Sequence, residues 1–192
     1  MRIGLFGGTF NPVHNGHIAL ARTAITKLKL DKVIFIPAYI PVHKDAVGII
    51  DAEDRLRMIE LAIEISPGYE ISRYEIDKKD KVYTVLTLRH FKNIYPKETE
   101  IFFLTGTDSL AELDTWKDLD KIFKLCRFVV FSRPGFSKDN GKQEVEIMDM
   151  DEVDISSSQI RERVSKENPI DNLVPVQVAN YIDENNLYKQ AR

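Results

Sequence analysis

Apolar residues follow two different spacings along this chain, and the two alternate from one end to the other. Short apolar or alternating runs are typical of strands, whereas apolar residues at every third or fourth position are typical of helices. The segments with the strand pattern are residues 3–6, 33–36, 69–76, 101–104, 128–131 and 145–148. The segments with the helical pattern are residues 17–28, 53–65, 82–91, 111–113, 119–125, 157–164 and 174–184.

This alternation predicts an α/β fold, a Rossmann-like doubly wound parallel sheet with helices on both faces. The sequence has no repeat and no low-complexity linker, so we expect residues 1–192 to form a single domain. Ligands of such sheets bind at the carboxyl ends of the strands. Gly7, Gly106 and Gly135 each lie where a predicted strand ends, which makes this edge the expected site.

Composition narrows the class of protein further. The 192 residues are 43% hydrophobic and 30% charged, as in ordinary soluble domains. A net charge of −3 argues against a nucleic-acid surface, so an anionic substrate would need a local cluster of positive groups. The single cysteine, Cys126, excludes a disulfide within the chain. No apolar run approaches the length of a membrane span, and the start resembles no signal peptide, so we expect a cytoplasmic protein.

The strongest chemical signal is GGTFNPVHNGH, residues 7–17, directly after the first predicted strand. Gly7 and Gly8 would let the backbone turn sharply and let a phosphate approach. His14 and His17 are three residues apart where a helix begins, so they can face one ligand, and Gly16 leaves room between them. A helix N-terminus adds N–H groups and partial positive charge that favour an anion. The alternatives are a glycine-rich turn with incidental histidines, or a zinc site, for which no third ligand lies nearby in sequence.

A second signal is ISSSQIRERV, residues 155–164. A serine cluster before Ile160 and Arg161 is typical of a helix N-terminus. Its hydroxyl and N–H groups could hold phosphate oxygens, with Arg161 one turn further along. The alternative is an ordinary serine cap followed by a solvated arginine. A third signal is PVHK, residues 41–44, in a loop after the second predicted strand, where the alternative is a solvated loop lysine.

These elements resemble, in order and spacing, those of the nucleotidyltransferase superfamily with the HxGH signature, present here as HNGH. The superfamily carries an ISS(S/T)xxR-type element that binds the triphosphate. Among its members, the nicotinate mononucleotide adenylyltransferases are the most similar. VYTVLTL at 82–88 resembles their YTVDTL segment, with Leu86 in place of Asp. Residues 106–108 resemble their GTD, residues 133–135 their RPG, and Trp116 stands where they have a tryptophan that packs on the pyridine ring.

The resemblance implies a reaction between ATP and nicotinate mononucleotide that yields the dinucleotide and pyrophosphate. It implies Mg²⁺ bound through the ATP phosphates, with no metal site built from the protein alone. The residues that it assigns to catalysis are His14, His17, Lys44 and Arg161. The residues that it assigns to ATP are Gly7, Gly8, Thr9, Phe10, Gly16, Gly106, Asp108, Ile155, Ser156, Ser157 and Ser158. The last four of these would form a phosphate-binding element at the start of the C-terminal helical part, from about residue 155. The residues that it assigns to the mononucleotide are His43, Thr84, Trp116 and Arg133.

Other readings remain open at this point. A phosphopantetheine adenylyltransferase usually has TxGH and lacks the YTV, GTD and tryptophan series, and cytidylyltransferases share HxGH but resemble the rest of the chain poorly. A non-catalytic nucleotide sensor on the same fold is an alternative of another class. The sequence leaves open a homo-oligomer, the strength of preference for the acid over the amide mononucleotide, and the effect of Leu86.

Overall fold

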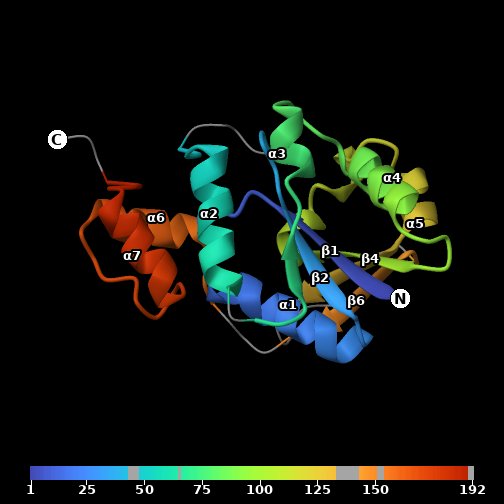
Figure 1. Cartoon of the computed structure of the whole chain (residues 1–192), viewed down its shortest axis with the longest axis horizontal. Coiled ribbons are helices and arrows are strands. Elements are labelled where there is room, and N and C mark those ends of the chain that lie inside the picture. Colours follow the sequence, from blue (N-terminus) through green and yellow to red (C-terminus); the bar gives the residue numbers. More distant parts are fainter. Residues whose placement is uncertain (43–47, 65, 133–142, 151–153, 190–192) are drawn as a thin grey trace.

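The chain folds around one parallel sheet, seen in the computed structural model, which describes residues 1–42, 48–64, 66–132, 143–150 and 154–189 (Figure 1). The strands are β1 (Arg2–Gly8), β2 (Lys32–Pro37), β3 (Tyr69–Ile71), β4 (Glu100–Gly106), β5 (Arg127–Ser132) and β6 (Val145–Asp149). Every neighbouring pair is parallel, and the order across the sheet is β3-β2-β1-β4-β5-β6. This order reverses between β1 and β4, which is where doubly wound sheets bind their ligands.

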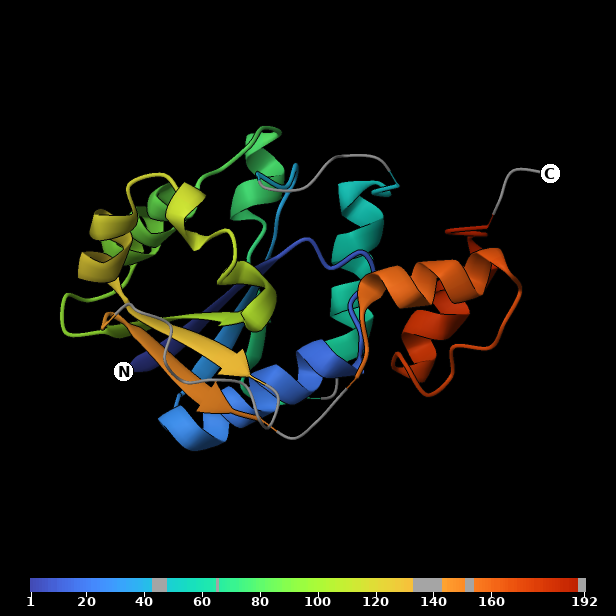
Figure 2. The ribbon, with the colours of Figure 1, turned by 180° about the vertical axis from the view of Figure 1, so that it is seen from behind.

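Helices cover both faces of the sheet, as the alternating pattern predicts. They are α1 (Asn15–Leu28), α2 (Ala52–Ile63), α3 (Tyr74–Lys78), α4 (Thr84–Ile94), α5 (Leu119–Leu125), α6 (Ser157–Ser165) and α7 (Val176–Glu184). The helices α4 and α5 lie on one side, while α6 and α7 lie beside α2 at the opposite end of the molecule (Figures 1 and 2). Within the described ranges, no helix has both the length and the apolar character needed to cross a membrane.

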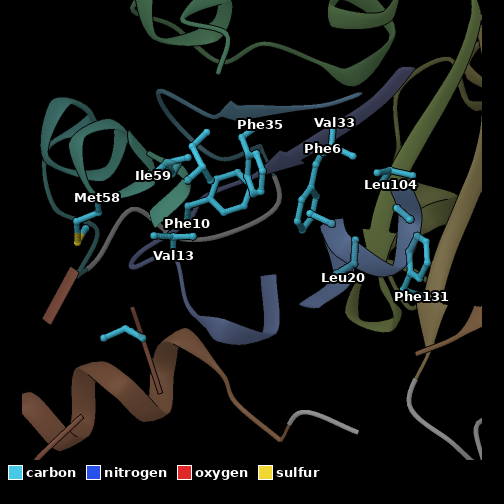
Figure 3. Close-up of a cluster of buried hydrophobic side chains, with 14 of the residues drawn as sticks. Phe6, Phe10, Val13, Leu20, Val33, Phe35, Met58, Ile59, Leu104 and Phe131 are labelled. Carbon is cyan, nitrogen blue, oxygen red and sulfur yellow. The ribbon is translucent and has the colours of Figure 1, made fainter. Parts of the chain in front are cut away.

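Side chains of successive strand residues divide between two hydrophobic clusters. On β2, Val33 and Phe35 join the cluster of α1, α2, α6 and α7, while Ile34 and Ile36 join the cluster of α4 and α5. Strands buried on both faces explain why their sequences are continuous apolar runs. In the first cluster, Phe10 points toward Phe35 and Ile59 beneath the loop that follows β1 (Figure 3). The core therefore supports this loop directly.

Two expectations for local structure were wrong. Residues 69–76 alternate like one strand, but β3 ends at Ile71 and α3 begins at Tyr74. The Tyr74 N–H donates to Ser72 Oγ (3.2 Å), and such local bonds from serine compete with a strand ladder. The expected α-helix at 111–113 is also absent: a short 3₁₀ turn precedes it at Thr107–Ser109, and a second one begins at its last residue, Leu113–Thr115.

Candidate active site

Two cavities meet at the carboxyl ends of β1 and β4, at the point where the strand order reverses. The larger has a volume of about 470 Å³ and the smaller about 170 Å³. The residues that line both are Gly7, Gly8, Thr9, Thr105 and Ser109. A two-part hollow of this kind can hold two ligands with their reacting ends close together.

The larger cavity brings together residues that lie far apart in the sequence. Its wall includes every described residue that the sequence assigns to ATP, together with His14, His17 and Arg161. The HxGH string comes from the loop after β1, Asp108 from the turn after β4, and the serines from the start of α6. The grouping that the resemblance implies is therefore present as one continuous surface.

The two histidines of HxGH stand at the beginning of α1. His14 is the residue before the helix, in extended conformation, and its ring stacks on that of His17 with centroids 3.7 Å apart. The His14 backbone N–H donates to His17 Nδ1 (3.2 Å). Because Nδ1 accepts a hydrogen bond, the proton of a neutral His17 ring must sit on Nε2. This bond therefore selects the tautomer in which Nε2 can donate to a phosphate oxygen.

Backbone groups at the start of α1 are partly engaged within the protein. The Asn15 N–H donates to the Leu173 carbonyl and the His17 N–H to the His14 carbonyl, both at 2.9 Å. Fewer N–H groups are thus available to an anion than a bare helix N-terminus would offer. We therefore expect the imidazole rings of His14 and His17, more than the backbone N–H groups, to make the hydrogen bonds to phosphate.

The His14 ring is almost fully buried, and this burial lowers its pKa from 6.5 to about 4. A folded-state pKa below that of the unfolded chain means that unfolding takes up a proton between these two values. We therefore expect the free energy of unfolding to fall as the pH drops from 6.5 toward 4. His14→Gln should remove this loss. The free energies of unfolding at pH 7 and at pH 5 should then differ by roughly 2 kcal/mol less than in the original chain.

Urea unfolding at both pH values measures this difference for the variant and for the original chain. His90→Gln is the matched control. Burial also lowers the pKa of His90, but its ring is only partly covered and stacks on that of Tyr74, so this variant should narrow the difference less. Groups whose pKa is shifted in the opposite direction, such as Glu75, are present in both proteins, so their contributions cancel in the comparison. An equal pH dependence in His14→Gln and the original chain would contradict the expectation.

The two glycines that end β1 are needed for close packing rather than for a turn. Neither Gly7 nor Gly8 has a positive φ, which corrects the expectation of a sharp turn. A Cβ on Gly8 would lie 3.0 Å from the Phe10 ring, and one on Gly7 would lie 3.2 Å from the Phe103 ring. The left-handed residue here is Phe10 itself, with φ 49°. Its ring fills the space beneath the loop that a side chain at Gly8 would need.

The helix α6 is docked onto the HxGH loop by hydrogen bonds. Ser156 caps it by accepting from the Gln159 N–H, as the serine cluster predicts. The Ser157 hydroxyl donates to the Pro12 carbonyl (2.8 Å), so it would reach a phosphate only after releasing that bond. Arg161 donates from Nη1 to the Asn11 carbonyl (2.8 Å) and from Nη2 to Ser158 Oγ (3.1 Å). The guanidinium thus joins the two motifs and lies in the cavity wall.

Replacing Arg161 with lysine is expected to lower turnover with ATP on the order of tenfold or more. Lysine keeps the charge but loses the planar fork that reaches two partners, and charge-assisted hydrogen bonds are worth about 1.5–3 kcal/mol. Steady-state kinetics with varied ATP measure the loss. Arg163→Lys on the same helix is the matched control, because Arg163 bonds the Pro169 carbonyl and does not line the cavity. Equal kinetics for both variants would place Arg161 outside the site.

The smaller cavity contains the described residues that the sequence assigns to the mononucleotide. Thr84 begins α4, where the first N–H groups have no partner within the helix, and Trp116 also lines this cavity. The Trp116 ring packs edge-on against Phe103 and Phe128, at centroid distances of 5.8 and 5.6 Å. The Trp116 ring therefore packs in the core and also lines the cavity. Leu86, the departure from the family, is exposed on α4 and does not line the cavity.

The sequence interpretation missed an arginine that supports both cavities. Arg55 is fully buried on α2 and donates to the carbonyls of Thr9 and Ala38 (2.7 Å each), Tyr39 (2.9 Å) and Ile50 (3.2 Å). It thereby holds the loop after β1 against the loop after β2. A charged residue in helical phase with Ala52 and Ile59 on an apolar face was the available signal.

Three predicted residues, His43, Lys44 and Arg133, lie outside the described residues, so their roles stay predictions. Over the described ranges, no group of three or more His, Cys, Asp or Glu residues could hold a metal ion.

Comparison with known proteins gives a consistent result. The cytidylyltransferase-like family matches residues 5–163. A protein of Clostridium botulinum (strain Eklund 17B / Type B) named "Probable nicotinate-nucleotide adenylyltransferase" is 42% identical over 98% of both chains. One of the same name from Thermoanaerobacter sp. (strain X514) is 38% identical over 99% of this chain and 95% of its own. Nicotinic acid mononucleotide adenylyltransferase of Plasmodium falciparum, solved with NaAD, shares the fold with a TM-score of 0.81, 97% coverage of both chains and 18% identity.

Proposed function

The chain belongs to the cytidylyltransferase-like family and, within it, to the nicotinate-nucleotide adenylyltransferases, and from this premise we propose its reaction. It transfers the adenylyl group of ATP to nicotinate mononucleotide, which gives nicotinate adenine dinucleotide and pyrophosphate. The observation that carries this proposal is the junction of the two cavities beside Gly8 and Thr9. One cavity would hold the triphosphate and the other the pyridine ring, and the new bond would form where they meet.

The larger cavity would act by alignment and by stabilising charge. A phosphate oxygen of the mononucleotide attacks the α-phosphorus of ATP, and the bond from that phosphorus to the β-phosphate bridging oxygen breaks. The attacking oxygen is already anionic near neutral pH, so no residue has to remove a proton. His14 and His17 would donate hydrogen bonds to the phosphoryl oxygens, and Arg161 would neutralise charge on the leaving pyrophosphate. Lys44 would add a second positive charge.

The smaller cavity would hold the pyridine ring. Trp116 offers a flat aromatic face for stacking, and the N-terminus of α4 at Thr84 offers backbone N–H groups and a partial positive charge to the carboxylate of nicotinate. Lys117 lies in the same wall, with Nζ 4.6 Å from the centre of the Tyr83 ring, and adds positive charge nearby.

A divalent cation, which we propose to be Mg²⁺, would accompany ATP. The donor set fits a metal held mainly by the substrate, because Asp108 is the single carboxylate among the described residues that line the larger cavity. Bound to phosphate oxygens and water, Mg²⁺ would neutralise charge on the triphosphate.

Release of pyrophosphate from ATP, measured with each acceptor in turn, tests the proposed function. We expect release with nicotinate mononucleotide and none above background with phosphopantetheine, choline phosphate or glycerol phosphate. Release with one of the latter would assign the chain to another branch of the family. Tight ATP binding without release for any acceptor would instead indicate a nucleotide sensor.

A further inference from the structure

A buried carboxyl group lies in the wall of the smaller cavity. Glu75 stands on the short helix α3 and is 8% exposed, with part of its surface facing the cavity. Thr87 on α4, which is 1% exposed, donates its hydroxyl to Glu75 Oε1 at 2.6 Å. Glu75 lies in none of the motifs that the sequence singles out, and Thr87 lies in the 82–88 segment without a role assigned to it. A carboxyl group at this position is unexpected, because an ionised one would repel the carboxylate of the proposed acceptor.

Charges around Glu75 do little to stabilise its ionised form. Burial raises its pKa to about 7, although the hydrogen bond from Thr87 lowers it in part. The ionisable groups nearby are Tyr74, Asp77 and Lys78 on α3, His90 on α4, and Tyr83, Glu112 and Lys117 on the cavity wall. Three of the charged ones have other contacts: Asp77 pairs with Arg73, Lys78 lies over the Tyr74 ring, and Lys117 lies over the Tyr83 ring.

Building on the function proposed above, we propose that Glu75 determines acceptor specificity in this cavity and must be protonated when a pyridine carboxylate occupies it. Two ionised carboxylates held close together in a hollow of about 170 Å³ repel each other, which favours the protonated form of one of them. A protonated Glu75 instead presents an O–H that can donate to the acceptor carboxylate, while Oε1 keeps the bond from Thr87. The amide acceptor carries no charge and has N–H groups of its own, so ionised Glu75 does not exclude it.

The two acceptors should therefore respond differently to pH. As the pH rises above the pKa of Glu75, the fraction of enzyme that accepts the acid should fall about tenfold per pH unit. The amide should be affected much less. Both acceptors carry the same 5′-phosphate, so ionisation of that phosphate, of ATP and of metal-bound water affects both alike. The ratio of kcat/KM for the acid to that for the amide isolates the effect of the cavity.

The decisive measurement is this ratio between about pH 6 and pH 9 for the original chain and for Glu75→Gln. Glutamine is neutral at every pH, and its Oε1 can still accept from Thr87. We expect the ratio of the original chain to fall on the order of tenfold or more above pH 7, and that of the variant to stay constant. A ratio that is independent of pH in the original chain, or that falls equally in Glu75→Gln, would overturn the proposal.

A second pair of variants tests the same group without replacing it. Thr87→Val removes the hydrogen bond that favours the ionised carboxyl, so the midpoint of the pH profile should move up, by on the order of one pH unit. Thr87→Ser keeps the hydroxyl and should leave the midpoint unchanged. An unmoved midpoint in Thr87→Val would count against Glu75 as the titrating group. Failure of the proposed function looks different, because neither acceptor would then release pyrophosphate with the original chain.

Discussion

Replacing His17 with alanine is expected to reduce turnover by a factor on the order of 10²–10³, which is the cost of losing one preorganised donor to developing charge. His17 lines the larger cavity, and its Nδ1 accepts the His14 N–H at 3.2 Å. This bond holds the ring in the tautomer with the proton on Nε2. Alanine would remove both the proposed phosphate contact and the hydrogen bond that His17 accepts at the start of α1. Pyrophosphate release at saturating substrates measures the loss.

Two further variants at His17 separate these contributions. His17→Asn places an acceptor close to the position of Nδ1, so it should keep the start of α1 intact and yet lose as much turnover as alanine. His17→Gln places an N–H donor closer to the position of Nε2 and should recover part of the turnover. Thermal unfolding of each variant should lie near that of the original chain. If His17→Ala unfolds, or if it retains full activity, the histidine has a structural role only.

The acid form of the mononucleotide is expected to be favoured over the amide in kcat/KM by roughly 10²-fold or more near neutral pH. The N-terminus of α4 at Thr84 offers backbone N–H donors, and an amide would turn its own N–H groups toward some of them. Polar groups that are left buried and unpaired discriminate between ligands on this scale. Parallel assays with both acceptors measure the ratio. Equal efficiency, or preference for the amide, would contradict the assignment within the family but not the nucleotidyltransferase class.

Trp116 should contribute to binding of either acceptor and little to ATP. Trp116→Ala is expected to raise KM for the mononucleotide much more than KM for ATP, because the ring lines only the smaller cavity. Trp116→Phe is the matched variant, since a smaller ring can keep the edge contacts with Phe103 and Phe128 and part of the stacking face. A parallel rise in KM for both substrates in Trp116→Ala would indicate general loosening of the core.

Much of the fold could be predicted because its signals are local. Continuous apolar runs predict β1, β2, β4 and β5, since strands covered on both faces need apolar residues at nearly every position. Ser156 and the residues after it predict the start of α6 to within one residue. The segment at 69–76 shows the limit of this reasoning. Its alternating pattern suits a strand, but a turn at Ser72 and the packing of Ile76 against α2 decide in favour of α3.

The sequence by itself determined the class of fold, and it predicted the edge of the sheet where the cavities lie and two motifs proposed to hold phosphate. These follow from periodicity and from residue types within one short segment. Only the tertiary structure decided that Arg161 bonds the carbonyl of Asn11, that Arg55 bonds the carbonyls of both Thr9 and Ala38, and that Glu75 lines the smaller cavity. Partners separated by up to 150 positions leave no local pattern, because their contact depends on how complete elements pack.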